Sequence, residues 1–436
     1  MTIVKTIFKS ITRPSLHRDA GLYTAFNAAA ALFPFFVTLI LTRLVLPADY
    51  GLYGIVLVAV TLVTPLVSMG VETAIGRRFV DRTDIDFPRY VSTAVLISFA
   101  FAIGAFVVAH IAQDYLFELF PLPSPWLWAW IVVAWSQVLL TTVLTLLQME
   151  QKPVEYGFWR VARAGGIQVV IGVTAVMGLV TWQALVMSLA IANIALTLSC
   201  LVWLRNRGYG VVRFSLHDAR AALRYGAPLL PHMLSASILL AAGPFFLAAM
   251  KGVEAAGIYT VGLTLSQVMT MIGGALNRAW TPWYYQKMKT NGTNSRYAIA
   301  RGGTAFISCM LLAGTGLALI GWLVFPWIVG ADYTTAALIF VWLVGAWTAH
   351  NILGLVSSYL YYTHRTGWIS GISIVAISVN LSLTPIFIRT YGSAGAAAAV
   401  CIAYVTALAL GILVTGFFAT TLSTPEDCIR ESLRGD

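Results

Sequence analysis

Long apolar runs, separated by short polar or Pro- and Gly-containing breaks, dominate the pattern along the chain. A helix that spans a bilayer needs about 20 apolar residues, and most runs reach that length. They predict twelve spans, at residues 21–46, 52–75, 90–112, 126–149, 157–180, 182–204, 223–250, 256–281, 298–325, 333–362, 367–389 and 393–420. The connections are short. We therefore expect an all-α integral membrane protein without an extramembrane catalytic domain.

Composition supports this fold class. Hydrophobic residues make up 59% and charged residues 10% of the 436 positions, whereas soluble domains carry about 25% charged residues. A soluble enzyme is thereby excluded. The first residues run into a full-length apolar helix and do not have the pattern of a cleaved signal peptide. The four cysteines avoid the predicted outer loops and the six histidines show no ligand spacing, so we expect no disulfide, metal or cofactor.

The distribution of the basic residues explains the net charge of +10. With the N-terminus in the cytoplasm, 24 of the 27 Lys and Arg residues fall on the inner side, and only Arg43, Lys251 and Arg389 fall outside. A missed or extra helix would scramble this asymmetry, which is the one that orients membrane proteins. We expect both termini to be cytoplasmic and no nucleic-acid partner.

The chain divides into two predicted halves. The longest inner loop before the tail, at 205–222, separates an N-terminal lobe (1–206, six spans) from a C-terminal lobe (207–422, six spans), followed by a tail (423–436). A short sequence echo occurs at the start of the second span of each half: Gly51-Leu52-Tyr53 in the first half is similar to Gly257-Ile258-Tyr259 in the second. Both halves begin on the inner face, so the echo predicts a parallel repeat.

Polar residues recur at three- or four-residue spacing on one face of several spans. They are Asn27, Pro34, Thr38 and Thr42 in 21–46; Thr61, Thr64, Ser68 and Glu72 in 52–75; Gln137, Thr141, Thr145 and Gln148 in 126–149; Thr260, Thr264, Gln267, Gly274 and Arg278 in 256–281; and Trp347, His350, Asn351, Ser358 and Tyr361 in 333–362. Such groups avoid lipid. They predict either a shared polar cleft or close packing between helices.

Within this pattern we select candidate residues for substrate contact. The amide and imidazole side chains near mid-span are Gln267, Asn277, His350 and Asn351, and the seventh span adds His232. Trp347 lies one turn from His350 and Asn351 and offers a flat apolar surface. A flat ring beside hydrogen-bonding groups suits a sugar. Pro228 and Pro231 bracket the start of the seventh span and predict a hinge or a fixed bend.

The signs of the charges near the membrane indicate an anionic substrate. We place no carboxylate at the midplane, the usual coupling device for protons or sodium; Glu72 comes nearest, about a turn from the inner end of its span. Arg77 and Arg278 lie at the predicted inner mouth and Arg43 at the outer mouth, where arginine can pair with phosphate. The alternative for these arginines is anchoring at lipid headgroups.

Several stretches resemble one family of bacterial membrane proteins. They are Thr42–Leu44, Pro47–Tyr53, Gly70–Arg77, Tyr225–His232, Gly257–Tyr259, Ala279–Trp283 and Asn380–Ala399. Together they resemble the bacterial polysaccharide transporters, which flip undecaprenyl-pyrophosphate-linked oligosaccharides and belong to the multidrug/oligosaccharidyl-lipid/polysaccharide exporter superfamily. Where relatives often carry an acidic-basic pair before two aromatics in the seventh span, this chain has Gly243 and Pro244 before Phe245 and Phe246.

The resemblance implies two six-helix lobes around a central cavity that opens alternately to each side of the bacterial inner membrane. It also implies a lipid-linked oligosaccharide substrate whose polyprenyl tail stays in lipid, and partners among glycan polymerases and glycosyltransferases. If the resemblance holds for the substrate, Arg278, Arg43 and Arg77 attract the pyrophosphate. The sugar is then contacted by Gln267, Asn277, Trp347, His350, Asn351 and His232.

The sequence leaves three alternatives open. A drug-cation antiporter of the same superfamily would need a buried carboxylate for coupling. A membrane-embedded glycan polymerase or ligase would present a sizeable outer loop with catalytic groups, and the outer links here are short. A non-transporting scaffold for glycosyltransferases is the third.

Overall fold

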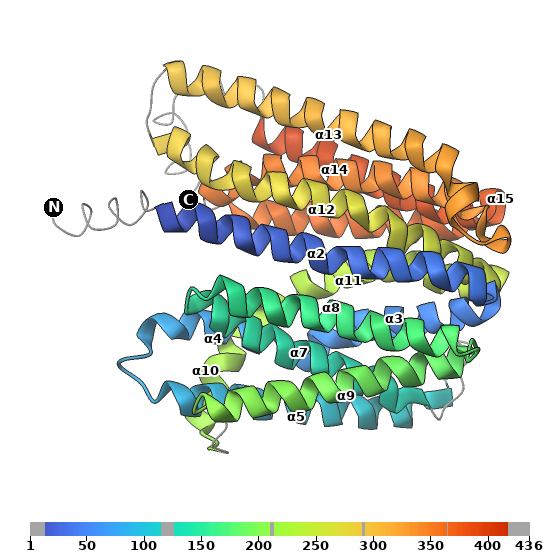
Figure 1. Ribbon diagram of the computed structural model, residues 1–436. Coiled ribbons are helices and arrows are strands. Elements are labelled where there is room, and N and C mark those ends of the chain that lie inside the picture. The colour runs from blue at the N-terminus through green and yellow to red at the C-terminus, as the bar shows by residue number, and fades with distance from the viewer. Residues whose placement is uncertain (1–13, 115–125, 210–212, 290–292, 364, 417–436) are drawn as a thin grey trace. The chain divides into compact units, whose positions relative to one another are not determined.

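The computed structural model describes residues 14–114, 126–209, 213–289, 293–363 and 365–416 (Figure 1). Every regular element in these ranges is helical. The long helices are α2 (Pro14–Leu44), α3 (Pro47–Ser68), α5 (Phe87–Ile111), α7 (Leu127–Met149), α8 (Pro153–Val176), α9 (Trp182–Asn206), α11 (Leu230–Lys251), α12 (Val253–Lys289), α13 (Thr293–Ile328), α14 (Ala336–Tyr362) and α15 (Thr366–Thr415). Shorter pieces are α4 (Val71–Arg78), η1 (Phe79–Asp81), α10 (Leu216–Gly226), η3 (Ala227–Leu229) and η4 (Ala331–Tyr333).

The all-α membrane fold predicted from the sequence is confirmed. Each predicted span corresponds to helix, and ten helices in the described ranges are long and apolar enough to cross a bilayer. The last of them, Gly367–Thr415, contains the eleventh and twelfth predicted spans. Helix α8, the fifth predicted span, is not among the ten because Arg160 and Arg163 lower the apolarity of its first half. The count of twelve therefore stays a prediction.

The chain folds into two compact units, Met1–Ala241 and Ala242–Asp436. The N-terminal unit is built around α7, which contacts α3, α4, α5, α8 and α9. Its most apolar window is 67% buried, so α7 is covered by protein rather than by lipid. Helix α2 packs along α8, where Gly165 leaves room for the ring of Phe33.

The Asp49 side chain fixes the start of α3. It accepts a hydrogen bond from the backbone N–H of Trp182 at the first residue of α9, at 2.9 Å. One residue further, the hydroxyl of Tyr50 lies 3.3 Å from Thr38 Oγ1 of α2. The Asp-Tyr pair within Pro47–Tyr53 thus joins three helices of the N-terminal unit.

The C-terminal unit is built around α14, which contacts α12, α13 and α15. Its most apolar window is 67% buried, whereas that of α13 is 11% buried. Helix α13 therefore lies at the periphery of this unit, and its leucines and tryptophans are exposed where lipid would contact them.

Tyr259 accounts for the glycine at position 243 in the seventh span. Its side chain is 1% exposed and lies against Gly243 of α11, where a Cβ would overlap the phenol ring. A larger side chain at Gly243 would compete for this space. The aromatic residue of the Gly257–Tyr259 echo is thereby packed between two helices of its own unit.

The second predicted span, 52–75, is not one helix. It breaks at Met69 and Gly70, which have φ of 47° and 70°, and Glu72 lies on the separate helix α4. The reason is a close approach of two backbones: a Cβ on Gly70 would lie 2.8 Å from Gly226 Cα. Only glycine combines this conformation with this contact.

The predicted loop 205–222 is also partly helical. Residues 216–226 form α10, which contacts α4 and α5 of the N-terminal unit. Ser215 caps this helix by accepting the backbone N–H of Asp218 at 3.3 Å. The start of α10 is therefore set by an ordinary helix-capping signal.

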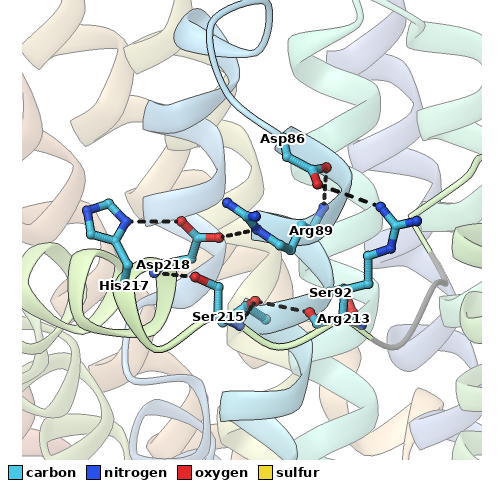
Figure 2. Close-up of polar contacts among 8 residues, drawn as sticks. Asp86, Arg89, Ser92, Arg213, Ser215, His217 and Asp218 are labelled. Carbon is cyan, nitrogen blue, oxygen red and sulfur yellow. Dashed lines mark hydrogen bonds and ion pairs between the residues drawn. The ribbon is translucent and has the colours of Figure 1, made fainter.

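Hydrogen bonds to α5 hold the segment that leads into α10 (Figure 2). Arg213 donates its backbone N–H to Ser92 Oγ at 3.2 Å, and its carbonyl accepts from Thr93 Oγ1 at 3.2 Å. The same Thr93 oxygen accepts the N–H of Ser215 at 3.2 Å. Both hydroxyls are buried, so they satisfy backbone groups that would otherwise lack partners.

Ion pairs complete this junction (Figure 2). Arg89 of α5 donates from Nε to Asp218 Oδ2 of α10 at 3.0 Å, and Arg213 lies 3.7 Å from Asp86. Asp218 is the more buried acid, with 13% of its side chain exposed. The predicted division at residue 206 precedes α10, which packs on α4 and α5 of the N-terminal unit. The bounds of the two lobes stay a prediction.

Candidate functional site

The contact between α12 and α14 organises the polar residues of the C-terminal unit. Asn351 of α14 inserts at Gly273 of α12, where a Cβ would overlap its amide. Its Nδ2 donates to the carbonyls of Trp347 at 2.8 Å and Met269 at 3.3 Å. Asn277 Nδ2 donates to the Asn351 carbonyl at 3.1 Å. These amides join the two helices.

Trp347 contributes to the same contact. Its Nε1 donates to Ser266 Oγ at 2.9 Å, and the side chain is 4% exposed. Asn351 is 5% exposed. The structure therefore gives both residues a role in positioning α12 against α14, and their predicted contact with sugar stays a prediction.

His350 points to the accessible side of α14. It is exposed, as is Gly354 one turn later, and its ring packs edge-on against Tyr404 at 4.9 Å and lies 6.2 Å from Trp347. Two aromatic neighbours hold the imidazole in place while its outer edge stays accessible. Tyr404, in the second half of α15, was not among the sequence candidates because only the fold brings it to His350.

Arg278 and Asn277 form the adjoining part of the same face. Arg278 is exposed, and no ion pair engages it in the ranges that the structure describes. Asn277 lies next to Gly354, where a Cβ would come within 3.1 Å of its Oδ1. That oxygen is buried without a hydrogen-bond donor among the described residues, which leaves an acceptor open.

Gln267, three turns before Arg278 on α12, belongs to this side of the helix. It is half-buried, and its Oε1 accepts from Thr270 Oγ1 at 3.2 Å. We call Gln267, Asn277, Arg278, His350 and Gly354 the polar face. One permanent cation, two amides and an imidazole, with no carboxylate bonded to them among the described residues, suit an anionic, hydroxyl-rich ligand.

The other candidate residues lie in the N-terminal unit. Arg43 is exposed in the last turn of α2. Arg77 pairs with Asp81 at 3.4 Å, and Arg78 contacts the same carboxylate at 3.3 Å. These pairs are exposed and therefore weak.

The predicted hinge lies at a helix boundary. Pro228 lies in η3 and Pro231 in the first turn of α11, so both stand where a helix starts. His232 follows in α11, and its side chain lies outside the described residues.

Glu72 is not available to a ligand in this conformation. It is buried and accepts a hydrogen bond from Ser68 Oγ at 2.6 Å, and Ser68 Oγ in turn accepts the backbone N–H of Gly70 at 3.0 Å. Its carboxylate therefore stabilises the break between α3 and α4.

A second polar cluster joins the ends of α7, α8 and α9. Arg207 contacts Glu150 at 3.2 Å and Glu155 at 2.7 Å, and Lys152 also contacts Glu150, at 2.7 Å. Tyr209 donates its hydroxyl to Glu150 at 3.4 Å. Burial first, and the Glu150 charge second, raise the pKa of Tyr209, so the phenol stays a neutral donor.

Several solved structures share the fold of this chain. Over 92% of this chain and 90% of the other, it is similar to the lipid II flippase MurJ in an inward closed conformation, with a TM-score of 0.74 at 12% identity. It is similar to a MATE transporter in a straight conformation, with a TM-score of 0.60, 16% identity and coverage of 94% and 96%. A MATE transporter of Vibrio cholerae gives a TM-score of 0.58 at 12% identity, covering 93% and 98%. The chain therefore shares its fold with MurJ and the MATE transporters.

The sequence then identifies the family. Residues 40–351 match the model of the polysaccharide biosynthesis protein family, and the chain belongs to that family. No curated protein matches the sequence significantly.

Proposed function

We propose that this protein is a flippase that moves an undecaprenyl-pyrophosphate-linked oligosaccharide across the bacterial inner membrane for the synthesis of a surface polysaccharide. Membership of the polysaccharide biosynthesis family carries this proposal, and the similarity in fold to a lipid II flippase supports it. Alternating access is the mechanism we propose, with both termini in the cytoplasm as the distribution of Lys and Arg predicts.

The polar face is our proposed contact for the head group. Arg278 would pair with the pyrophosphate, because guanidinium binds phosphate oxygens in a bidentate manner. His350, Asn277 and Gln267 would hydrogen-bond to sugar hydroxyls, with Trp347 and Asn351 holding α12 and α14 in register. Arg43, Arg77 and His232 remain proposed secondary contacts, and Pro228 and Pro231 the proposed hinge.

Deletion of the gene in its own host tests the proposal. We expect the surface polysaccharide to be lost and the lipid-linked oligosaccharide to accumulate on the inner side of the membrane, because synthesis continues while transfer stops. Expression of the wild-type chain should reverse both effects. Unchanged surface polysaccharide with no accumulated lipid-linked oligosaccharide would refute the proposal. Glycan polymerases and glycosyltransferases that use this substrate are the proposed partners.

A drug antiporter is the second candidate, because the MATE transporters share the fold. Coupling would require a carboxylate that exchanges protons or sodium ions. Glu72 is the carboxylate that the sequence places nearest to the membrane midplane. In the structure it is hydrogen-bonded to Ser68, next to Gly70. Drug efflux that is abolished by Glu72→Gln would favour this candidate. Absence of drug efflux by the wild-type chain would exclude it.

A further inference from the structure

A cavity of about 440 Å³ lies at one end of the C-terminal unit, away from the polar face. It is formed where α11 meets α12, where α14 begins, and where α15 changes direction at Gly392. Its size falls in the range of small-molecule sites, about 300–1,000 Å³. Ile258 and Leu338 contribute to an apolar floor.

Several polar side chains on the wall of this cavity have no hydrogen-bond or ion-pair partner among the residues that the structure describes. Lys251 and Glu254 line it on either side of the turn at Gly252 (φ 94°), and among the described residues no ion pair joins them. Ser393 also lines it, and Thr335 at the start of α14 makes no side-chain capping bond. Within the described part of the chain, no hydrogen bond engages the side chains of Lys251, Glu254 or Ser393.

A flat aromatic ring stands at the same cavity. Tyr391 is 69% exposed, although it occupies a membrane-protein helix of low polarity. Phe387, one turn earlier, holds the ring edge-on at 5.8 Å. The next residue, Gly392, has φ of 62° and ψ of −142°. Residues with a Cβ rarely adopt this backbone conformation, whereas glycine adopts it readily. Tyr391 and Ser393, on either side of this break, both line the cavity.

We infer that this cavity is a carbohydrate subsite. A sugar presents hydroxyl groups, which donate and accept, around flat apolar C–H faces. The Lys251 ammonium donates, the Glu254 carboxylate accepts and the Ser393 and Thr335 hydroxyls do both, while Tyr391 offers a ring face for stacking. The unpaired opposite charges favour a neutral or zwitterionic sugar over a simple anion.

The inference rests on the proposed function, and it adds a glycan contact at the opposite end of the C-terminal unit from Lys287 and Arg301. In the proposed orientation this end faces outward, because Lys251 and Arg389 are two of the three basic residues assigned to the outer side. The subsite would bind the glycan after translocation and discriminate among sugar units.

Saturation-transfer NMR tests the subsite. The probe is the water-soluble oligosaccharide released by mild acid from the lipid-linked pool of the host, added to the full-length purified protein in lipid nanodiscs. We expect transfer to the sugar protons and a dissociation constant that rises about tenfold in Tyr391→Ala, while Tyr391→Phe, which keeps the ring, stays near wild type. Tyr297→Ala is the matched control, since Tyr297 is 70% exposed in the same unit and lies near its other end.

The outcomes separate the subsite from the proposed function. Equal binding by Tyr391→Ala and wild type, with unchanged thermal unfolding, overturns the subsite, as does an equal loss in Tyr297→Ala. Absence of oligosaccharide binding by a chain that restores surface polysaccharide overturns the subsite alone. Binding that depends on Tyr391, in a chain that restores no polysaccharide, supports the subsite and refutes the flippase.

Discussion

At the scale of single residues, periodicity located the polar groups but did not assign their roles. Trp347, His350 and Asn351 fall within one turn of α14, yet Trp347 and Asn351 are buried in bonds to α12 whereas His350 is exposed. The difference depends on Gly273 and Ser266 of another helix, which provide the space and the acceptor. A single sequence contains no signal for that pairing of positions.

Asn351 and His350 should therefore respond differently to truncation. Asn351→Ala removes donors to two carbonyls and should lower the free energy of unfolding by about 1–3 kcal/mol. His350→Ala should leave stability nearly unchanged, because the side chain is exposed, and should slow transport. Thermal unfolding and transport measured on both variants check this contrast. A larger loss of stability in His350→Ala than in Asn351→Ala would contradict the assignment.

Arg278 should act through its charge. Arg278→Ala should reduce transport of the pyrophosphate-linked substrate about ten- to a hundredfold, since a charge-assisted bond of this kind contributes roughly 1.5–3 kcal/mol. Arg278→Lys should retain part of the activity. Arg301→Ala is the control, because Arg301 is also exposed in the C-terminal unit but lies on α13. Equal transport by Arg278→Ala and the control would show that the guanidinium does not bind substrate.

At the scale of elements, the sequence predicted helices well and their interruptions less well. Apolar length indicates a span, whereas the break between α3 and α4 depends on the approach of Gly70 to Gly226, which are far apart in the chain. Helix α10 carries a readable signal, Ser215 three residues before Asp218, which resembles a capping pattern. Its docking on α5 depends on Ser92 and Thr93, two residues in an otherwise apolar run.

The Gly70 contact gives a stability prediction. Gly70→Ala forces a side chain into a left-handed conformation and against the Gly226 backbone, so we expect a loss of about 1–3 kcal/mol. Gly104→Ala is the control, because nothing lies within 4 Å of a Cβ at that position of α5. Thermal unfolding of the detergent-solubilised variants measures both. Equal melting temperatures would mean that the α10 docking does not depend on this close approach.

At the scale of the whole molecule, composition and charge indicated the class of protein, and the resemblance indicated the family that residues 40–351 match. The two compact units follow from helix packing around α7 and α14. The break at Gly392 lies between the predicted spans 367–389 and 393–420, so the sequence located this interruption, whereas the turn geometry itself comes from the structure. Composition does not identify the substrate either, because substrate recognition depends on a few exposed side chains.

The orientation of the chain is testable by cysteine labelling. In a variant without the four native cysteines, Tyr391→Cys should react with a membrane-impermeant thiol reagent added outside spheroplasts, since Tyr391 is exposed at the end predicted to face outward. Tyr297→Cys should react only after the membrane is permeabilised. The reverse pattern would contradict the assignment of the basic residues to the cytoplasmic side.

Translocation by the purified protein tests the central claim most directly. The protein is reconstituted into vesicles that carry fluorescent polyprenyl-pyrophosphate oligosaccharide in both leaflets, and the fraction accessible to a membrane-impermeant quencher is followed over time. A flippase should make the label of the inner leaflet accessible, at a rate that falls with Arg278→Ala. Accessibility no greater than in protein-free vesicles would contradict the account.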